Sequence, residues 1–144
     1  MVKIAIADDQ VLFRDMLSII LKQEPAFEVV GCAGNGKEIV QLCGEKHPDV
    51  VLLDVKMPGR DGIDTLREIK HLAPMVEVLI LTGHASVETG IDSIKYGAFD
   101  YLMKPIDIEP LMEKLDAAYE RKRIQQEKLE AVQNKRDMVP PKKG

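Results

Sequence analysis

The stretch Val50-Val51-Leu52-Leu53-Asp54 decides the fold, because four consecutive apolar residues end at a single acid. A continuous apolar run of this length is typical of a strand that is buried on both faces of a parallel sheet. A second run of the same kind, Val78–Leu81, ends at Thr82. Two such strands predict a sheet that is covered by helices on both sides.

The sequence on either side of these runs alternates between strand and helix patterns. Further strands are predicted at Lys3–Ala7, Phe27–Ala33 and Tyr101–Met103. Apolar residues recur at helical spacing over 12–21, 39–43, 63–70, 87–94 and from about residue 107. The alternation predicts an α/β fold: a doubly wound, five-stranded parallel sheet with helices on both faces and an extended C-terminal helix.

Chemically active side chains follow the predicted strands. They are Asp8, Asp9, Asp54, Thr82 and Lys104. Each alone is ordinary capping or turn chemistry, but the carboxyl ends of parallel strands meet at one edge of the sheet, where ligands of such folds bind. Three carboxylates and one ammonium leave a charge of about −2, which Mg²⁺ would neutralise. The sequence therefore indicates a metal-assisted phosphoryl site with Asp54 as the nucleophile.

Four motifs carry a resemblance to a known family. They are Ile6–Asp9, Leu52–Gly62, Leu81–Gly83 and Tyr101–Pro105. Together they resemble the receiver domain of bacterial two-component response regulators, over residues 1–120. The resemblance implies the strand order 2-1-3-4-5. It also implies that Asp54 accepts a phosphoryl group from a histidine kinase or phosphotransfer protein, without a separate enzymatic activity beyond self-catalysed transfer and autodephosphorylation.

The resemblance also assigns roles within the site. Mg²⁺ would be held by Asp8 (mainly through water), Asp9, Asp54 and the backbone carbonyl of Lys56. Thr82 and Lys104 would contact the phosphoryl oxygens, and the Lys104–Pro105 bond would be cis. Thr82 and Tyr101 would switch the surface of the fourth helix, fifth strand and fifth helix, which is also a candidate homodimer face. By position, Lys56 and His84 lie two residues after Asp54 and Thr82 and flank the path of water to the site, so we expect both to tune the lifetime of the phosphorylated form; the alternative for His84 is an exposed loop histidine.

Composition limits the other classes of function. The chain has 144 residues, of which 45% are apolar and 31% charged, as expected of one globular domain. No apolar run is long enough to span a bilayer and no secretory signal opens the chain, so we expect a cytoplasmic protein without membrane contact. Cys32 and Cys43 form no metal or disulfide pattern, and both are expected to be small core residues.

Charge separates the tail from the body. Residues 1–119 carry a net charge of −8 and residues 120–144 a net charge of +4. An acidic body argues against direct nucleic-acid binding by residues 1–120.

We expect a helical extension over 121–138 and a disordered tail or linker over 139–144. A heptad pattern runs through the extension but is interrupted at Lys122 and Gln125, so a homodimer through the extension is an open alternative. The chain is expected to be either a stand-alone receiver or the N-terminal part of a transcriptional regulator.

Other interpretations of the motifs, as different classes of protein, remain open. A haloacid-dehalogenase phosphatase also uses an Asp nucleophile, but it requires a second Asp at the position of Lys56. A flavodoxin-like protein requires a hydroxyl-rich loop where Asp8 and Asp9 stand. Gly31–Lys37 matches a nucleotide-binding loop, yet Glu38 replaces the required Ser or Thr. A receiver-fold interaction module without phosphorylation is the last alternative.

Overall fold

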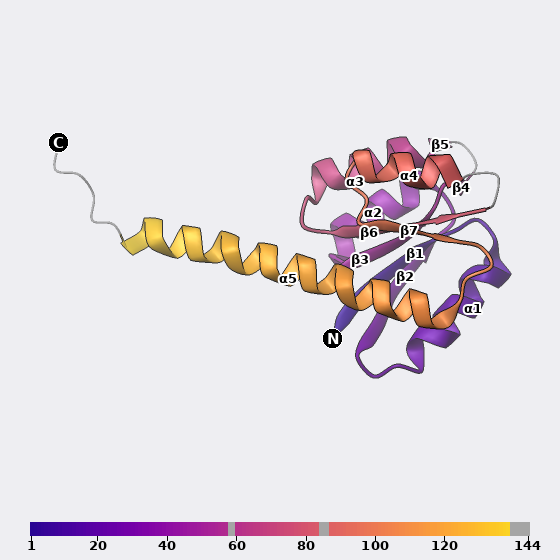
Figure 1. The fold of residues 1–144 in the computed structure, drawn as a ribbon, viewed down its shortest axis with the longest axis horizontal. Helices are drawn as coiled ribbons and strands as arrows, with labels where there is room; N and C mark the ends of the chain where they lie inside the picture. Colours follow the sequence, from indigo (N-terminus) through magenta and orange to yellow (C-terminus); the bar gives the residue numbers. More distant parts are fainter. Residues whose placement is uncertain (58–59, 84–86, 139–144) are drawn as a thin grey trace.

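The computed structural model describes residues 1–57, 60–83 and 87–138, and a single parallel sheet between two layers of helices dominates it (Figure 1). The sheet has the order β2-β1-β3-β6-β7. The strands are Val2–Ala7 (β1), Phe27–Ala33 (β2), Val50–Asp54 (β3), Glu77–Thr82 (β6) and Asp100–Met103 (β7). Counted alone, these five strands have the predicted order 2-1-3-4-5, which is confirmed.

Two short strands that the sequence did not predict account for the gap in numbering. Lys56–Met57 (β4) pairs antiparallel with Arg60–Asp61 (β5) in a separate sheet. Strands of two residues are too short to show periodicity, so no sequence pattern indicates them. Pro58 and Gly59, which separate the two strands in sequence, lie outside the described residues.

Five helices complete the doubly wound architecture. They are Val11–Lys22 (α1), Gly36–Lys46 (α2), Gly62–Leu72 (α3), Val87–Lys95 (α4) and Ile108–Met138 (α5). Helices α1 and α5 cover one face of the sheet, and α2, α3 and α4 cover the other (Figure 1). The predicted fold class is therefore confirmed.

The central strands are apolar throughout because both of their faces are buried. Val51 and Leu53 of β3 face the core that includes Leu66 of α3. Val50 and Leu52 face the opposite core, which includes Leu17 of α1 and Leu115 of α5. Burial of each such side chain contributes roughly 1.5–3 kcal/mol, so the two cores hold β3 firmly and fix where Asp54 emerges.

Helix α5 is partly core and partly extension. Leu111, Leu115 and Ala118 are buried against the sheet, and beyond them the helix projects away from the body (Figure 1). On the projecting part, Arg123 pairs with Glu120 and Glu127 at helical spacings that stabilise an exposed helix. Among the described residues, no helix combines the length and apolar character needed to cross a bilayer. The predicted tail at 139–144 lies outside the described residues.

Ion pairs tie α5 to the starting ends of three strands. Lys114 pairs with Asp100, the first residue of β7, and Arg121 pairs with Glu77, the first residue of β6. Lys122 pairs with Asp49, the residue before β3. These three strands are the ones whose opposite ends carry Asp54, Thr82 and Lys104.

The two thiols differ in their surroundings. Cys43 is buried, as predicted, but Cys32 is exposed, so the prediction of a core position was wrong for Cys32. Cys32 belongs to β2, which is an edge strand, and its Sγ lies 3.5 Å from Ser18 Oγ of α1. A small apolar residue on an edge strand has the same sequence signature as one on a central strand.

Candidate functional site

The carboxyl ends of β1, β3 and β6 bring three acids and a hydroxyl to one edge of the sheet. In the strand register Ala7 lies opposite Leu53, and Asp54 lies opposite Leu81. Asp8 and Asp9 directly follow β1, and Thr82 ends β6. One carboxylate oxygen from each of Asp8, Asp9 and Asp54 lies within 4.8 Å of the others.

Lys104 joins two of these acids, although it lies far from both in sequence. Its Nζ is 2.8 Å from Asp8 Oδ2 and 3.2 Å from Asp54 Oδ2. Its backbone N–H donates to the carbonyl of Thr82 at 2.7 Å, which fixes the chain as it leaves β7. The Lys104–Pro105 peptide bond is cis, the isomer that the resemblance implied.

Burial and charge act on the ionisation of Asp54 and Lys104. Asp54 is 6% exposed, and burial raises the pKa of its carboxyl group, with a further increase from the charge of Asp8. The Lys56 N–H, 2.9 Å from Asp54 Oδ1, and the Lys104 ammonium oppose that increase. Burial alone would lower the pKa of Lys104, but its carboxylate partners raise it overall.

The donor set suits a hard divalent cation. Three carboxylates against one ammonium leave an excess of negative charge in a largely buried space, where like charges repel most strongly. Asp8 is fully buried with Oδ1 accepting the Gln10 N–H at 2.8 Å, whereas Asp9 is exposed. The site is therefore open to solvent on the Asp9 side, and its oxygen donors are those that Mg²⁺ or a similar ion prefers.

The remaining predicted site residues are Thr82, Lys56, Tyr101 and His84. Thr82 is fully buried and its Oγ1 donates to the carbonyl of Gly83 at 3.2 Å. The side chain of Lys56 is exposed, and the proposed role of its carbonyl as a metal ligand stays a prediction. Tyr101 is half-buried on β7, with its ring so close to α4 that a Cβ at Gly90 would lie 3.0 Å from it. His84 lies outside the described residues.

Two residues of α1 that the sequence analysis did not assign to the site contact it. Arg14 donates through one guanidinium nitrogen to the carbonyl of Asp8 at 3.2 Å. The ring of Phe13 faces Lys104, with Nζ 4.2 Å from the ring centroid. In sequence both belong to an ordinary amphipathic helix, and the only available signal was their position within one turn of the acids.

The chain that leaves Asp54 is held by a close backbone contact. A Cβ at Gly62 would lie 2.6 Å from Val55 Cα and 2.7 Å from its carbonyl oxygen, so only glycine fits. Asp61 Oδ1 accepts the Ile63 N–H at 3.0 Å and caps α3 at this point. The start of α3 is thereby fixed against the loop that follows the acidic site.

The glycine-rich stretch 31–37 serves a structural purpose. Asn35 caps α2 by accepting the Glu38 N–H at 2.9 Å, and Glu38 Oε2 accepts the Gly34 N–H at 2.9 Å. The Glu38 carboxylate and the Asn35 side chain thus each accept a backbone N–H that a phosphate bound here would need. This arrangement supports the interpretation of the stretch as a strand-to-helix turn.

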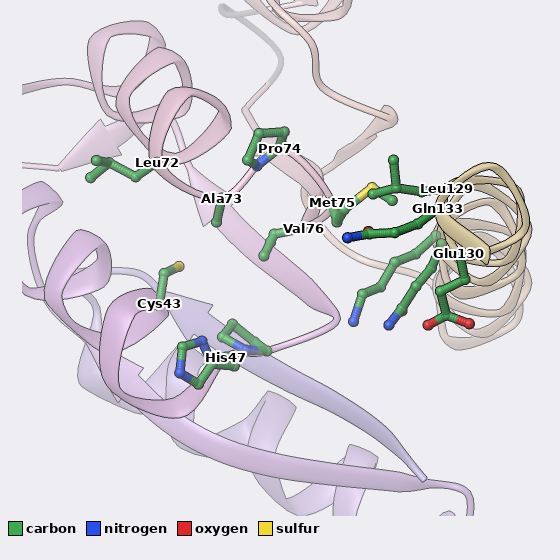
Figure 2. Close-up of a pocket in the computed structure, with 13 residues that line it drawn as sticks. Cys43, His47, Leu72, Ala73, Pro74, Met75, Val76, Leu129, Glu130 and Gln133 are labelled. Carbon is green, nitrogen blue, oxygen red and sulfur yellow. The ribbon is translucent and has the colours of Figure 1, made fainter. Parts of the chain in front are cut away.

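A hollow of about 460 Å³ lies at the opposite edge of the sheet from the acids. Residues 47–48 and 73–76, which precede β3 and β6, form one side of it, and the projecting part of α5 forms the other. Figure 2 shows Met75 on the side of Leu129 and Gln133. The hollow is separate from the acidic site and contains none of its residues.

The fold and site define a class of α/β domain with an acidic pocket and a lysine at the carboxyl edge of its sheet. Residues 4–116 match the response regulator receiver domain family, to which the chain belongs. Receiver domains of this family act as phosphoacceptors in two-component systems and interact with histidine kinases.

Individual relatives agree with this membership. The chain is 40% identical over 109 residues to the regulatory protein AtoC of Escherichia coli K12, covering 76% of this chain and 23% of AtoC. It is 41% identical over 121 residues to the transcriptional regulatory protein PdtaR of Mycobacterium tuberculosis H37Rv, covering 83% and 57% of the two chains. The chain thus spans about a quarter to just over half of these relatives.

Solved structures give the same result. A response regulator receiver domain protein from Clostridium thermocellum has a TM-score of 0.81 and 35% identity, covering 87% of this chain and 99% of that one. NtrX from Brucella abortus has a TM-score of 0.82 and 27% identity, covering 99% of this chain and 32% of that one.

Proposed function

We propose that this receiver domain is phosphorylated on Asp54 in a Mg²⁺-dependent reaction, with a histidine kinase or phosphotransfer protein as the donor. The observation that carries the proposal is the convergence of Asp8, Asp9 and Asp54 within 4.8 Å beside the Lys104 ammonium. An acidic cluster of this kind is costly for stability unless a cation neutralises it, and such a cation can also offset the charge of an incoming phosphoryl group.

The residues of the chain divide the chemistry between them. A carboxylate oxygen of Asp54 forms a bond to phosphorus as the bond from phosphorus to the donor imidazole breaks, and the leaving imidazole keeps the electron pair. The Lys56 N–H orients the Asp54 carboxylate, and Lys104 offsets charge on the transferred oxygens. Mg²⁺, held by Asp9 and Asp54 with Asp8 nearby, supplies additional charge neutralisation when bound. Water then attacks the phosphorus of the acyl phosphate, the bond to the Asp54 oxygen breaks, and the Asp54 carboxylate is restored as inorganic phosphate leaves.

The response to phosphorylation passes through Thr82 and Tyr101. A phosphorylated Asp54 carries about one more negative charge and offers three more acceptor oxygens, so the Thr82 hydroxyl gains a stronger acceptor than the Gly83 carbonyl. Its reorientation changes the space beside Tyr101, whose ring packs on α4 at Gly90. The surface of α4, β7 and α5 therefore changes between two states.

The donor protein docks on α1. Leu12, Met16 and Ile19 recur at helical spacing and are exposed by 86%, 46% and 62%. This stripe begins one turn after Asp8, so a protein bound to it would reach the site. Exposed apolar stripes next to a reactive group are typical of docking surfaces.

The extension of α5 sets limits on a homodimer. The first part of the heptad pattern, Leu111, Leu115 and Ala118, is already buried in the domain, and Lys122 pairs with Asp49. In the part of the extension that the structure describes, the large exposed apolar residues are Ile124, Leu129 and Val132. Homodimerisation through these residues would disappear on deletion of residues 121–144, and an unchanged mass in solution would reject it.

Mass spectrometry of the intact protein tests the proposed function. With a small phosphodonor such as acetyl phosphate and Mg²⁺, the wild type should gain one phosphoryl group, and Asp54→Asn should gain none. Asp64→Asn, which alters an exposed carboxylate on α3, is the matched control and should label normally. Equal labelling of Asp54→Asn would refute the assignment of the nucleophile, and an unlabelled wild type would favour an interaction module.

A further inference from the structure

The ring of Phe13 contacts the Lys104 ammonium of the acidic site. Its centroid lies 4.2 Å from Lys104 Nζ, inside the range in which an ammonium is attracted to the electron-rich face of a ring. Phe13 lies in the first turn of α1 and packs on the core that α1 shares with α5. The ring is therefore held in place by the fold and not only by the lysine.

The Lys104 ammonium is contacted by carboxylates and by the ring of Phe13. Two carboxylate oxygens, from Asp8 and Asp54, contact Lys104 Nζ at 2.8 and 3.2 Å, and the ring contributes a further contact. The side chain of Lys104 is only 21% exposed, so little water competes for it. Cation–π attraction is strongest under such partly desolvated conditions.

The ring differs from the carboxylates in one respect that matters for the reaction. Transfer of a phosphoryl group converts the Asp54 carboxylate into an acyl phosphate. A bound divalent cation interacts with the same carboxylates that pair with Lys104. The face of Phe13 stays the same throughout. It can hold the ammonium near the reacting oxygen while the ion-pair partners of Lys104 exchange.

We propose that Phe13 is a positioning residue for phosphoryl transfer, acting through the Lys104 ammonium. The inference rests on the proposed function and deepens it. It predicts that the aromatic ring, rather than apolar volume at this position, sets the rate of phosphorylation.

The test compares Phe13→Leu, which keeps apolar volume, with Phe13→Tyr, which keeps the ring. With acetyl phosphate and saturating Mg²⁺, Phe13→Leu should be phosphorylated about three- to tenfold more slowly, and Phe13→Tyr within about twofold of the wild type. Phe27→Leu is the matched control, because Phe27 is buried in the same core at the opposite edge of the sheet. It should lower the melting temperature and leave the rate unchanged.

A double-mutant cycle separates positioning from packing. In a Lys104→Ala background, Phe13→Leu should have no further effect on the rate. The same fold loss in both backgrounds, or a wild-type rate for Phe13→Leu, would overturn the inference.

A second measurement does not depend on phosphorylation. The ammonium resonance of Lys104 in the NMR spectrum should be displaced by the ring in the wild type and in Phe13→Tyr, and should lose that displacement in Phe13→Leu. An identical resonance in all three proteins would overturn the inference even if the wild type were never labelled. Failure of the wild type to label, with the displacement present, would count against the proposed function alone.

Discussion

Glu77 and Thr82 are the first and last residues of β6, so the strand that ends at the acidic site begins at a buried acid that pairs with Arg121 of α5. Glu77 is fully buried, and its partner Arg121 also lies over the ring of Phe99, 4.8 Å from the centroid. Through β6, a fully buried strand, the C-terminal helix is thus joined to the candidate site.

Arg121→Met should destabilise the domain, because the Glu77 carboxylate would remain buried without its cation. Loss of one partner of a buried pair costs about 3–5 kcal/mol, and the partial exposure of Arg121 reduces this to roughly 2 kcal/mol. Urea unfolding measures the change. Arg123→Met, two residues along the same helix in exposed pairs, is the control and should have little effect. Equal stabilities of the two variants would contradict the importance of the Glu77 pair.

A divalent cation should stabilise the protein through the acidic cluster. Mg²⁺ at about ten times its dissociation constant would add about 1.4 kcal/mol to the free energy of unfolding, seen as a higher melting temperature. Asp9→Asn and Asp54→Asn should reduce this gain, and Asp64→Asn should not. A gain of the same size in all variants would place the cation elsewhere.

Without divalent cations, Asp54→Asn should be more stable than the wild type at neutral pH. The pKa of Asp54 is raised in the folded state, so the stability it contributes is present at low pH and is lost as the pH rises through that pKa. At pH 7 its charge therefore opposes folding. Thermal unfolding in the presence of a chelator measures this, and a lower melting temperature for the variant would argue against the effect of burial.

The exposed stripe on α1 should matter only when the donor is a protein. Leu12→Ser and Ile19→Ser should slow transfer from a phosphorylated histidine kinase that labels the wild type, since they remove apolar contact area. Their labelling by acetyl phosphate should be unchanged. Leu72→Ser, on an exposed apolar residue of α3, is the control. If kinase and acetyl phosphate reactions slow equally, the stripe is not a docking surface.

Cys43 should make stability depend on alkaline pH. Burial raises the pKa of its thiol to about 11, above the value of about 9 in an unfolded chain. The stability that the neutral thiol provides is complete below pH 9 and is lost as the pH rises towards 11. Urea unfolding across this range should show the decline, and Cys43→Ala should show less of it. An identical decline in both proteins would assign it to other groups.

The fold and the acids of the site could be predicted because their signals are local. The run Val50–Leu53 is uniformly apolar since both faces of β3 are buried, and the acid that ends it has to emerge at the edge of the sheet. The family motifs then supplied roles for Thr82 and Lys104, which no pattern of composition or spacing supplies.

The parts that could not be predicted depend on contacts across the fold. Phe13 fits the apolar stripe of α1, and nothing local reveals that its ring faces a residue 91 positions later. Glu77 and Arg121 are 44 residues apart, and each resembles an ordinary surface charge. Cys32 was misplaced because periodicity does not distinguish an edge strand from a central one.

The location of the phosphoryl group tests the central claim most directly. Borohydride reduction of the phosphorylated protein converts an acyl phosphate on aspartate to homoserine, which peptide mass mapping can assign to one position. The account predicts homoserine at position 54 alone, formed only when Mg²⁺ was present during labelling. Homoserine at position 8 or 9, or a phosphoryl group held on a histidine, would contradict it.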